Sequence, residues 1–123
     1  VVFVTDPDTE SEFHQDHTVI GRMTGYIVNF AVNAPIMKSY GAGSADVKEL
    51  ALYFTDRPNF TVRAGKYFKI KIDAVLEHSS QFPSGAEDTK RMIRYLKLRR
   101  LFGKEEEFRV LDRFHMHCHP KML

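Results

Sequence analysis

Two groups of histidines have the residue types and spacing that metal chemistry needs. The first group is His14-Gln15-Asp16-His17, which offers two imidazoles and a carboxylate within one short stretch. The second group lies near the end of the sequence, at His115, His117 and His119. Imidazole nitrogens and carboxylate oxygens are common ligands of Zn²⁺ in proteins. A fold that brings the two groups together would therefore hold a divalent metal such as Zn.

The second histidine group falls within a run of alternating residues. Apolar and polar side chains alternate from Phe108 to His119, which predicts a final strand with a basic, histidine-bearing face. Alternate side chains on a strand lie roughly 7 Å apart, so two of these histidines can reach one ion and a remote ligand, His14 or His17, would complete the site. Such a site would activate water. The alternative is that the histidines are polar surface side chains that titrate near neutral pH.

A strongly basic segment is the other feature with a chemical meaning. Six of the eleven residues from 90 to 100 are basic. Phosphate backbones favour such clusters because each neutralised phosphate releases condensed counterions, and arginine binds phosphate through two hydrogen bonds. With two arginines from the expected final strand, the candidate polyanion-binding residues are Lys90, Arg91, Arg94, Lys97, Arg99, Arg100, Arg109 and Arg113. The sequence thus predicts contact with a nucleic acid, and an acidic protein surface is the alternative partner.

Sequence motifs typical of enzymes are missing. Gly41-Ala42-Gly43 lacks the Lys-Ser/Thr pair that follows the glycines of a phosphate-binding loop. No nucleophile-elbow pattern surrounds Ser79-Ser80. Cys118 is the only cysteine, so no disulfide forms within the chain, and alternation along a strand would bury its thiol. We therefore expect a binding protein rather than an enzyme.

Extended segments are expected to carry these side chains. Residues 1–4 and 49–55 are rich in residues that favour strands. Residues 17–33 form a longer apolar run, in which Gly21 and Gly25 indicate bulges or a bend. These segments predict a sheet-rich chain.

A hairpin is expected in the middle of the chain. Phe60–Val62 and residues 67–72 flank the turn residues 63–66, and the second arm alternates between apolar and charged residues. The pattern Val-x-Ala-Gly-x-x-Phe-x-Ile-x-Ile, from residue 62 to residue 72, resembles the passage between the first two strands of immunoglobulin-like sandwiches. The fold that follows is mainly β, a two-layer β-sandwich of the immunoglobulin-like kind, with an α+β fold as the alternative.

One basic helix is expected near residues 85–102. Ser84-Gly85-Ala86-Glu87 matches a capping box, in which the serine and glutamate side chains each accept a hydrogen bond from a free backbone N–H. Gly103 follows the last helix-forming residues, where a C-terminal cap would lie. Acidic residues at the start of this segment and basic residues at its end also suit the helix dipole.

Length and composition frame the functional alternatives. The 123 residues, 43% of them hydrophobic, fit one β-rich domain spanning 1–123, and the missing initiating Met indicates a piece excised from a longer protein. The sequence contains no apolar run of the roughly 20 residues that a membrane-spanning helix needs. The single cysteine favours a reducing compartment, and so an intracellular location in the nucleus or cytoplasm.

The function expected from these features is a non-enzymatic binding module whose basic helix and neighbouring strand contact a nucleic acid. Two alternatives stay open. One is a structural or oligomerising assembly domain, because open strand edges permit self-association. The other is a histidine-rich metal-binding protein or metalloenzyme.

Overall fold

The computed structural model describes residues 1–82, 85–103 and 106–117, without the side chains of Ser79 and His117. Two compact units make up the chain. The first contains Val1–Phe60 together with the chain from Glu107 onward, and the second contains Thr61–Glu106.

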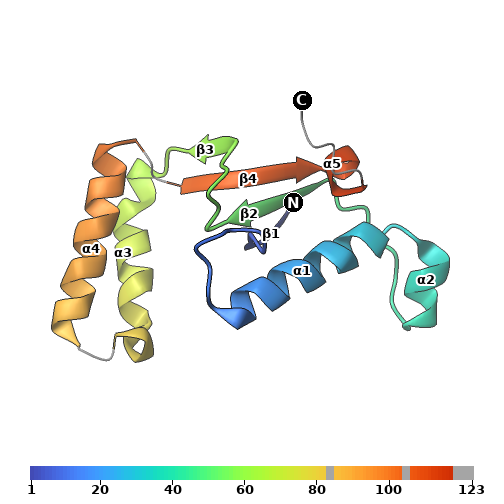
Figure 1. The fold of residues 1–123 in the computed structure, drawn as a ribbon, viewed down its shortest axis with the longest axis horizontal. Helices are drawn as coiled ribbons and strands as arrows, with labels where there is room; N and C mark the ends of the chain where they lie inside the picture. The colour runs from blue at the N-terminus through green and yellow to red at the C-terminus, as the bar shows by residue number, and fades with distance from the viewer. Residues whose placement is uncertain (83–84, 104–105, 118–123) are drawn as a thin grey trace. The chain divides into compact units, whose positions relative to one another are not determined.

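The first unit is built on a β-α-β crossover (Figure 1). β1 (Val2–Thr5) pairs with β2 (Glu49–Tyr53) in parallel, with Val2 opposite Leu50. Two parallel strands cannot be joined by a tight turn, so the chain between them must cross over. That crossover carries α1 (Gln15–Phe30) and the short helix α2 (Ala34–Ser39).

Two further strands complete a four-stranded mixed sheet. β4 (Glu106–Asp112) runs antiparallel to β2, and the order across the sheet is β1-β2-β4-β3, with β3 at Phe60–Val62. Asn59, just before β3, receives a backbone hydrogen bond from Val110 at 2.7 Å and donates its side-chain amide back to the carbonyl of Val110 at 3.0 Å. This side chain therefore supplies two ladder-like hydrogen bonds beside β4.

The core of the first unit lies between the sheet and α1, which runs along one face of β1 and β2 (Figure 1). Its buried members are Val4, Val28, Leu50 and Leu52, and none of them is more than 7% exposed. The register places Val4 opposite Leu52, so that these two side chains point to the same face. The hydrophobic effect at this layer fixes α1, and with it the turn that begins α1, against the sheet.

The prediction of a strand over residues 17–33 is wrong, because this segment forms α1. Its most buried positions are Gly21, Val28 and Ala31, separated by seven and three residues, which is a helical spacing. The β-branched residues that favoured a strand are largely exposed, as Val19 and Ile20 illustrate at 47% and 51%. The spacing of the buried residues therefore indicates a helix, although the residue types favour a strand.

The second unit consists of a helical hairpin. It contains the 3₁₀ turn η1 (Gly65–Tyr67), α3 (Phe68–Glu77), the 3₁₀ turn η2 (Ser79–Gln81) and α4 (Ala86–Leu101). α3 and α4 lie side by side (Figure 1), and the guanidinium of Arg100 lies 4.9 Å from the centre of the Phe68 ring.

The predicted hairpin over residues 60–72 is right only in its first arm. β3 forms at Phe60–Val62, but residues 67–72 enter η1 and α3. The half-buried positions of α3 are Phe68, Lys71, Ile72 and Val75. They follow the i, i+3, i+4, i+7 spacing of a helix, which the alternation of apolar and charged residues had masked.

The basic helix is confirmed as α4. Gly85 precedes it with φ 64°, and Gly103 follows it with φ 71°, a conformation that glycine adopts without strain. The Ser84 half of the predicted capping box lies outside the described residues, and no side chain caps α4 at Gly85.

The strand predicted over residues 108–119 ends early. β4 stops at Asp112, and Arg113–His117 forms the short helix α5. Asp112 accepts hydrogen bonds from the backbone N–H and the ring Nδ1 of His115, at 2.9 and 2.7 Å, and this side-chain cap begins the helix. Cys118 and His119 lie outside the described residues.

These elements overturn the predicted fold class. A mainly β, immunoglobulin-like sandwich is wrong, because about half of the described residues are helical and their one sheet has four strands with a parallel pair. Among the described residues, no helix is long and apolar enough to cross a membrane.

Two glycines of α1 provide a matched test of this packing. A Cβ at Gly21 would lie 2.6 Å from the backbone oxygen of Thr5, whereas a Cβ at Gly25 would meet nothing within 4 Å. We expect Gly21→Ala to lower the free energy of unfolding by about 1–3 kcal/mol, through overpacking against β1. Gly25→Ala should raise it by up to about 1 kcal/mol, because alanine favours a helix. Urea denaturation measures both; equal stability of the two variants would contradict the close approach of α1 to β1.

Candidate functional site

The candidate site is the histidine turn, which we define as residues 12–17, at the start of α1. α1 begins at Gln15, and His14 occupies the N-cap position with an extended backbone and no side-chain cap. The side chain of Glu12 instead accepts hydrogen bonds at the start of the helix and orients the two histidines. Its Oε1 accepts the backbone N–H of His14 at 2.7 Å, and its Oε2 lies 2.8 Å from Nδ1 of His17. One carboxylate therefore holds both histidines of the turn.

The two imidazoles of the histidine turn face each other. The ring centres of His14 and His17 are 4.5 Å apart and the ring planes differ by 22°, so the rings are stacked. His14 Nδ1 lies 3.9 Å from a carboxylate oxygen of Asp16. Each ring thus has its Nδ1 beside a carboxylate oxygen.

The electrostatics of Glu12 follow from these hydrogen bonds. The bond with the His17 ring, followed by the bond from the His14 backbone, lowers the pKa of Glu12 below its ordinary value of 4.5. Glu12 is therefore ionised at neutral pH and acts as the acceptor in its hydrogen bond with the His17 ring. His17 consequently carries its proton on Nδ1 when neutral, and its Nε2 lone pair is available as a base or as a ligand.

Residues at the ends of β1 and β2 contact the histidine turn. The hydroxyl of Thr5, a buried residue at the end of β1, donates to the backbone carbonyl of His17 at 2.6 Å. Phe54, directly after β2, has φ 56°, a conformation that a bulky side chain rarely adopts. Its ring centre lies 6.0 Å from that of His17. Backbone strain of this kind concentrates at functional sites, where the surrounding structure enforces it.

The predicted metal site does not assemble among the described residues. They contain no group of three or more His, Cys, Asp or Glu side chains that could hold a metal ion. Catalytic zinc sites use three protein ligands, and the two imidazoles and two carboxylates of the histidine turn do not form such a group. The donor set of the described residues therefore does not fit a complete zinc site, and we derive no chemical step through a metal.

The C-terminal histidines are arranged differently from the prediction. His115 lies on α5, where its ring is bound to Asp112, and not on a strand face with alternate histidines. The backbone of His117 belongs to the same helix, and His119 lies outside the described residues. The strand face that was expected to present two of these histidines to one ion therefore does not form over residues 113–117.

Several of the predicted polyanion-binding side chains are engaged within the protein. On α4, Arg91 lies 3.9 Å from Glu87, Arg99 donates to the hydroxyl of Tyr95 at 3.1 Å, and Arg100 lies over Phe68. The other basic residues of α4 are exposed: Lys90, Arg94 and Lys97.

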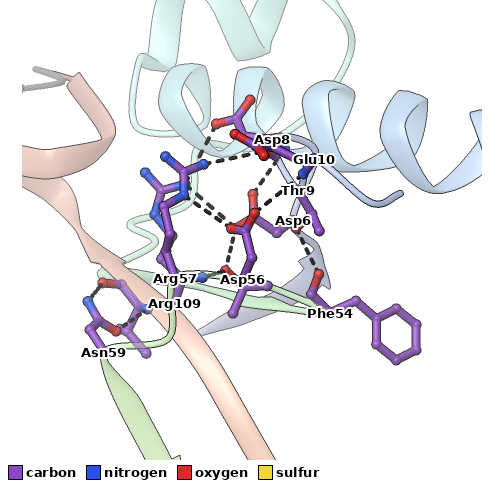
Figure 2. Close-up of polar contacts among 11 residues, drawn as sticks. Asp6, Asp8, Thr9, Glu10, Phe54, Asp56, Arg57, Asn59 and Arg109 are labelled. Atoms are coloured by element: carbon purple, nitrogen blue, oxygen red, sulfur yellow. Dashed lines mark hydrogen bonds and ion pairs between the residues drawn. The ribbon is translucent and has the colours of Figure 1, made fainter. Parts of the chain in front are cut away.

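The two arginines of the first unit are also paired. Arg113 donates to Asp46 at 2.5 Å, and Arg109 is only 18% exposed beside Asp6 and Asp8. Figure 2 shows Arg109 and Arg57 pointing toward the carboxylates that follow β1. The predicted basic surface therefore does not extend through Arg109, because its guanidinium is committed to internal carboxylates.

Comparison with known proteins finds similarity to deacetylases in sequence and in fold. No family model matches the sequence. The sequence is 30% identical over 86 residues to the diacetylchitobiose deacetylase of Thermococcus kodakarensis, a match that covers 68% of this chain and 32% of that protein. The structure is similar to that of N,N'-diacetylchitobiose deacetylase from Pyrococcus horikoshii complexed with its inhibitor MPG. The TM-score is 0.79 and the identity 24%, over 98% of this chain and 49% of that one.

These similarities show the fold and correct the expected class of function. The chain has the fold of part of a deacetylase, and it spans about half the length of the solved structure and about a third of the curated relative. The prediction of a non-enzymatic nucleic-acid-binding module is wrong, because the relatives in sequence and in fold are enzymes.

The sequence pointed to His14 and His17 but missed their orienting partner. Glu12 lies two residues before His14, and an acidic residue at that spacing can accept a hydrogen bond from a free backbone N–H at the start of a helix. It was not recognised because the segment that follows was interpreted as a strand.

The Glu12 hydrogen bonds predict a pH-dependent contribution to stability. The folded pKa of Glu12 is lowered, so its stabilisation is fully present above 4.5 and is lost as pH falls through the folded pKa. We expect Glu12→Gln to lower the melting temperature at pH 7 and to approach the wild type in more acidic buffer. Thermal unfolding across pH 2–7 measures this, and Glu10→Gln controls for the loss of one negative charge in the same loop. A pH-independent difference would contradict the ionised hydrogen bond.

Proposed function

We propose that this chain carries acid–base groups of a hydrolytic deacetylase that acts on an N-acetylated amino sugar. The observation that supports this most strongly is the histidine turn. There, two imidazoles are stacked and each has its Nδ1 beside a carboxylate oxygen. The names of the relatives in sequence and fold supply the substrate class.

Amide hydrolysis needs a base and an acid at neighbouring positions. The base takes a proton from water as the water oxygen bonds to the acetyl carbon. The acid gives a proton to the nitrogen as the carbon–nitrogen bond breaks, and acetate and a free amine leave. Imidazole suits both roles near neutral pH, because its ordinary pKa is about 6.5.

The environments of the two rings suggest how the roles divide. His17 is held by the ionised Glu12, which stabilises the positive charge that the ring gains when it accepts a proton from water. His14 is more exposed, with 60% of its side chain accessible against 38% for His17, and its ring is stacked on the ring of the base. We assign proton abstraction to His17 and proton donation to the departing amine to His14.

Substitution of His17 tests the proposal. Amine release from N,N'-diacetylchitobiose should fall at least about 100-fold in kcat/KM for His17→Asn, because general base catalysis contributes about 10²–10⁴-fold. Glu12→Gln should lower kcat with little change in KM, since the orienting charge acts on the base and not on the sugar. Assays with and without added Zn²⁺ separate the effect of the histidines from that of a metal.

His115→Gln is a matched control for this assay. His115 also has Nδ1 bound to a carboxylate, at 2.7 Å from Asp112, but it belongs to α5 and not to the histidine turn. We expect this variant to keep wild-type activity. Unchanged activity in folded His17→Asn, or an equal loss in His115→Gln, would overturn the proposed role of the histidine turn.

A further inference from the structure

A fully buried carboxylate marks the point where β1 ends. The side chain of Asp6 is 0% exposed. Its Oδ2 accepts the hydroxyl of Thr55 at 2.7 Å, and its Oδ1 accepts the backbone N–H of Asp8 at 3.0 Å. The backbone N–H of Asp6 donates to the carbonyl of Tyr53 at 2.8 Å. Asp6 thus joins the end of β1 to the end of β2 and turns the chain toward the histidine turn.

Arg109 on β4 supplies the charge that balances this carboxylate. Its Nη1 lies 3.6 Å from an oxygen of Asp6 and 3.6 Å from an oxygen of Asp8. Within the described part of the chain, this buried Nη1 makes no hydrogen bond. The guanidinium therefore sits between two carboxylates and acts on both through charge, rather than through one short bond (Figure 2).

The loop beyond Asp6 is tied to the end of β2 at further points. The hydroxyl of Thr9 donates to the carbonyl of Phe54 at 2.8 Å, and the backbone N–H of Glu10 donates to Asp56 at 3.4 Å. Arg57 donates to the carbonyl of Asp8 at 3.3 Å. Figure 2 shows these contacts converging on one loop. The loop ends at Glu12, the residue that orients both histidines.

We infer that Arg109 is a positioning residue for the histidine turn: through Asp6 and Asp8 it holds the β1–α1 loop so that Glu12 meets His14 and His17. The inference deepens the proposed function and rests on it for its catalytic meaning. The connection from Arg109 to His17 is short, because Thr5, the neighbour of Asp6 in the sequence, also donates a hydrogen bond to the carbonyl of His17.

The physics of buried ion pairs favours positioning over stability as the role of Arg109. Removing two charges from water costs about as much as their attraction returns, so a buried pair is weak evidence of net stabilisation. It does restrict the arrangements that the loop can adopt, because any arrangement that separates the charges leaves one of them buried and unpaired.

Nuclear magnetic resonance of the histidine rings tests the inference without a substrate. In isotope-labelled wild type, we expect His17 to show the single tautomer with its proton on Nδ1. In Arg109→Met, we expect the His17 ring signals to move toward an average of both tautomers, because the loop no longer holds Glu12 in place. Arg113→Met is the matched control, since it removes an arginine that pairs with Asp46 in the same unit. Its His17 signals should match wild type.

Each outcome decides the inference. Folded Arg109→Met with wild-type His17 signals overturns it, as does an equal change in Arg113→Met. If Arg109→Met does not fold, Asp8→Asn replaces it, because half of the Asp8 side chain is exposed and its loss is easier to tolerate. A shifted His17 signal in Asp8→Asn supports the inference, and an unchanged one overturns it. A chain without deacetylase activity that shows these shifts would overturn the proposed function alone.

Discussion

Parallel pairing of β1 with β2 is the constraint on which the first unit depends. The two strands point in the same direction, so the chain must travel back along the sheet before β2 begins. α1 carries the chain back along the sheet, and Val28 on its buried face is part of the core. The start of α1 consequently lies beyond the carboxyl ends of both strands, where side chains are free to meet a ligand. The histidine turn occupies that place because the topology puts it there.

The charged and titratable side chains at this edge of the sheet form an inner and an outer layer. Asp6 and Arg109 are shielded from water and fix the path of the backbone. The rings of His14 and His17 are more exposed, at 60% and 38% of their side-chain surfaces. The two layers therefore differ in how far their side chains are exposed to solvent.

Local signals in the sequence identified some elements, and packing decided the others. Residues 49–53 and the helix at 86–101 were predicted, because short apolar runs and capping glycines act within a few residues. α1 and α3 were mistaken for strands, because β-branched and alternating residues mimic a half-buried strand when the buried side is unknown. The histidine turn was visible as His14 and His17. The pairing of Asp6 with Arg109 joins distant parts of the sequence, and no local pattern could reveal it.

The helical hairpin is an insertion in the sequence of the first unit, between Phe60 and Glu107. The two ends of this insertion are brought together by Asn59, whose hydrogen bonds to Phe108 and Val110 lie within the first unit. Chain segments whose ends already meet can be exchanged or shortened at a small cost in loop-closure entropy. The helical hairpin is accordingly the part of this protein that can be replaced most readily while the strands of the sheet keep their order. A short turn between Val62 and Glu106 would be enough to connect β3 to β4.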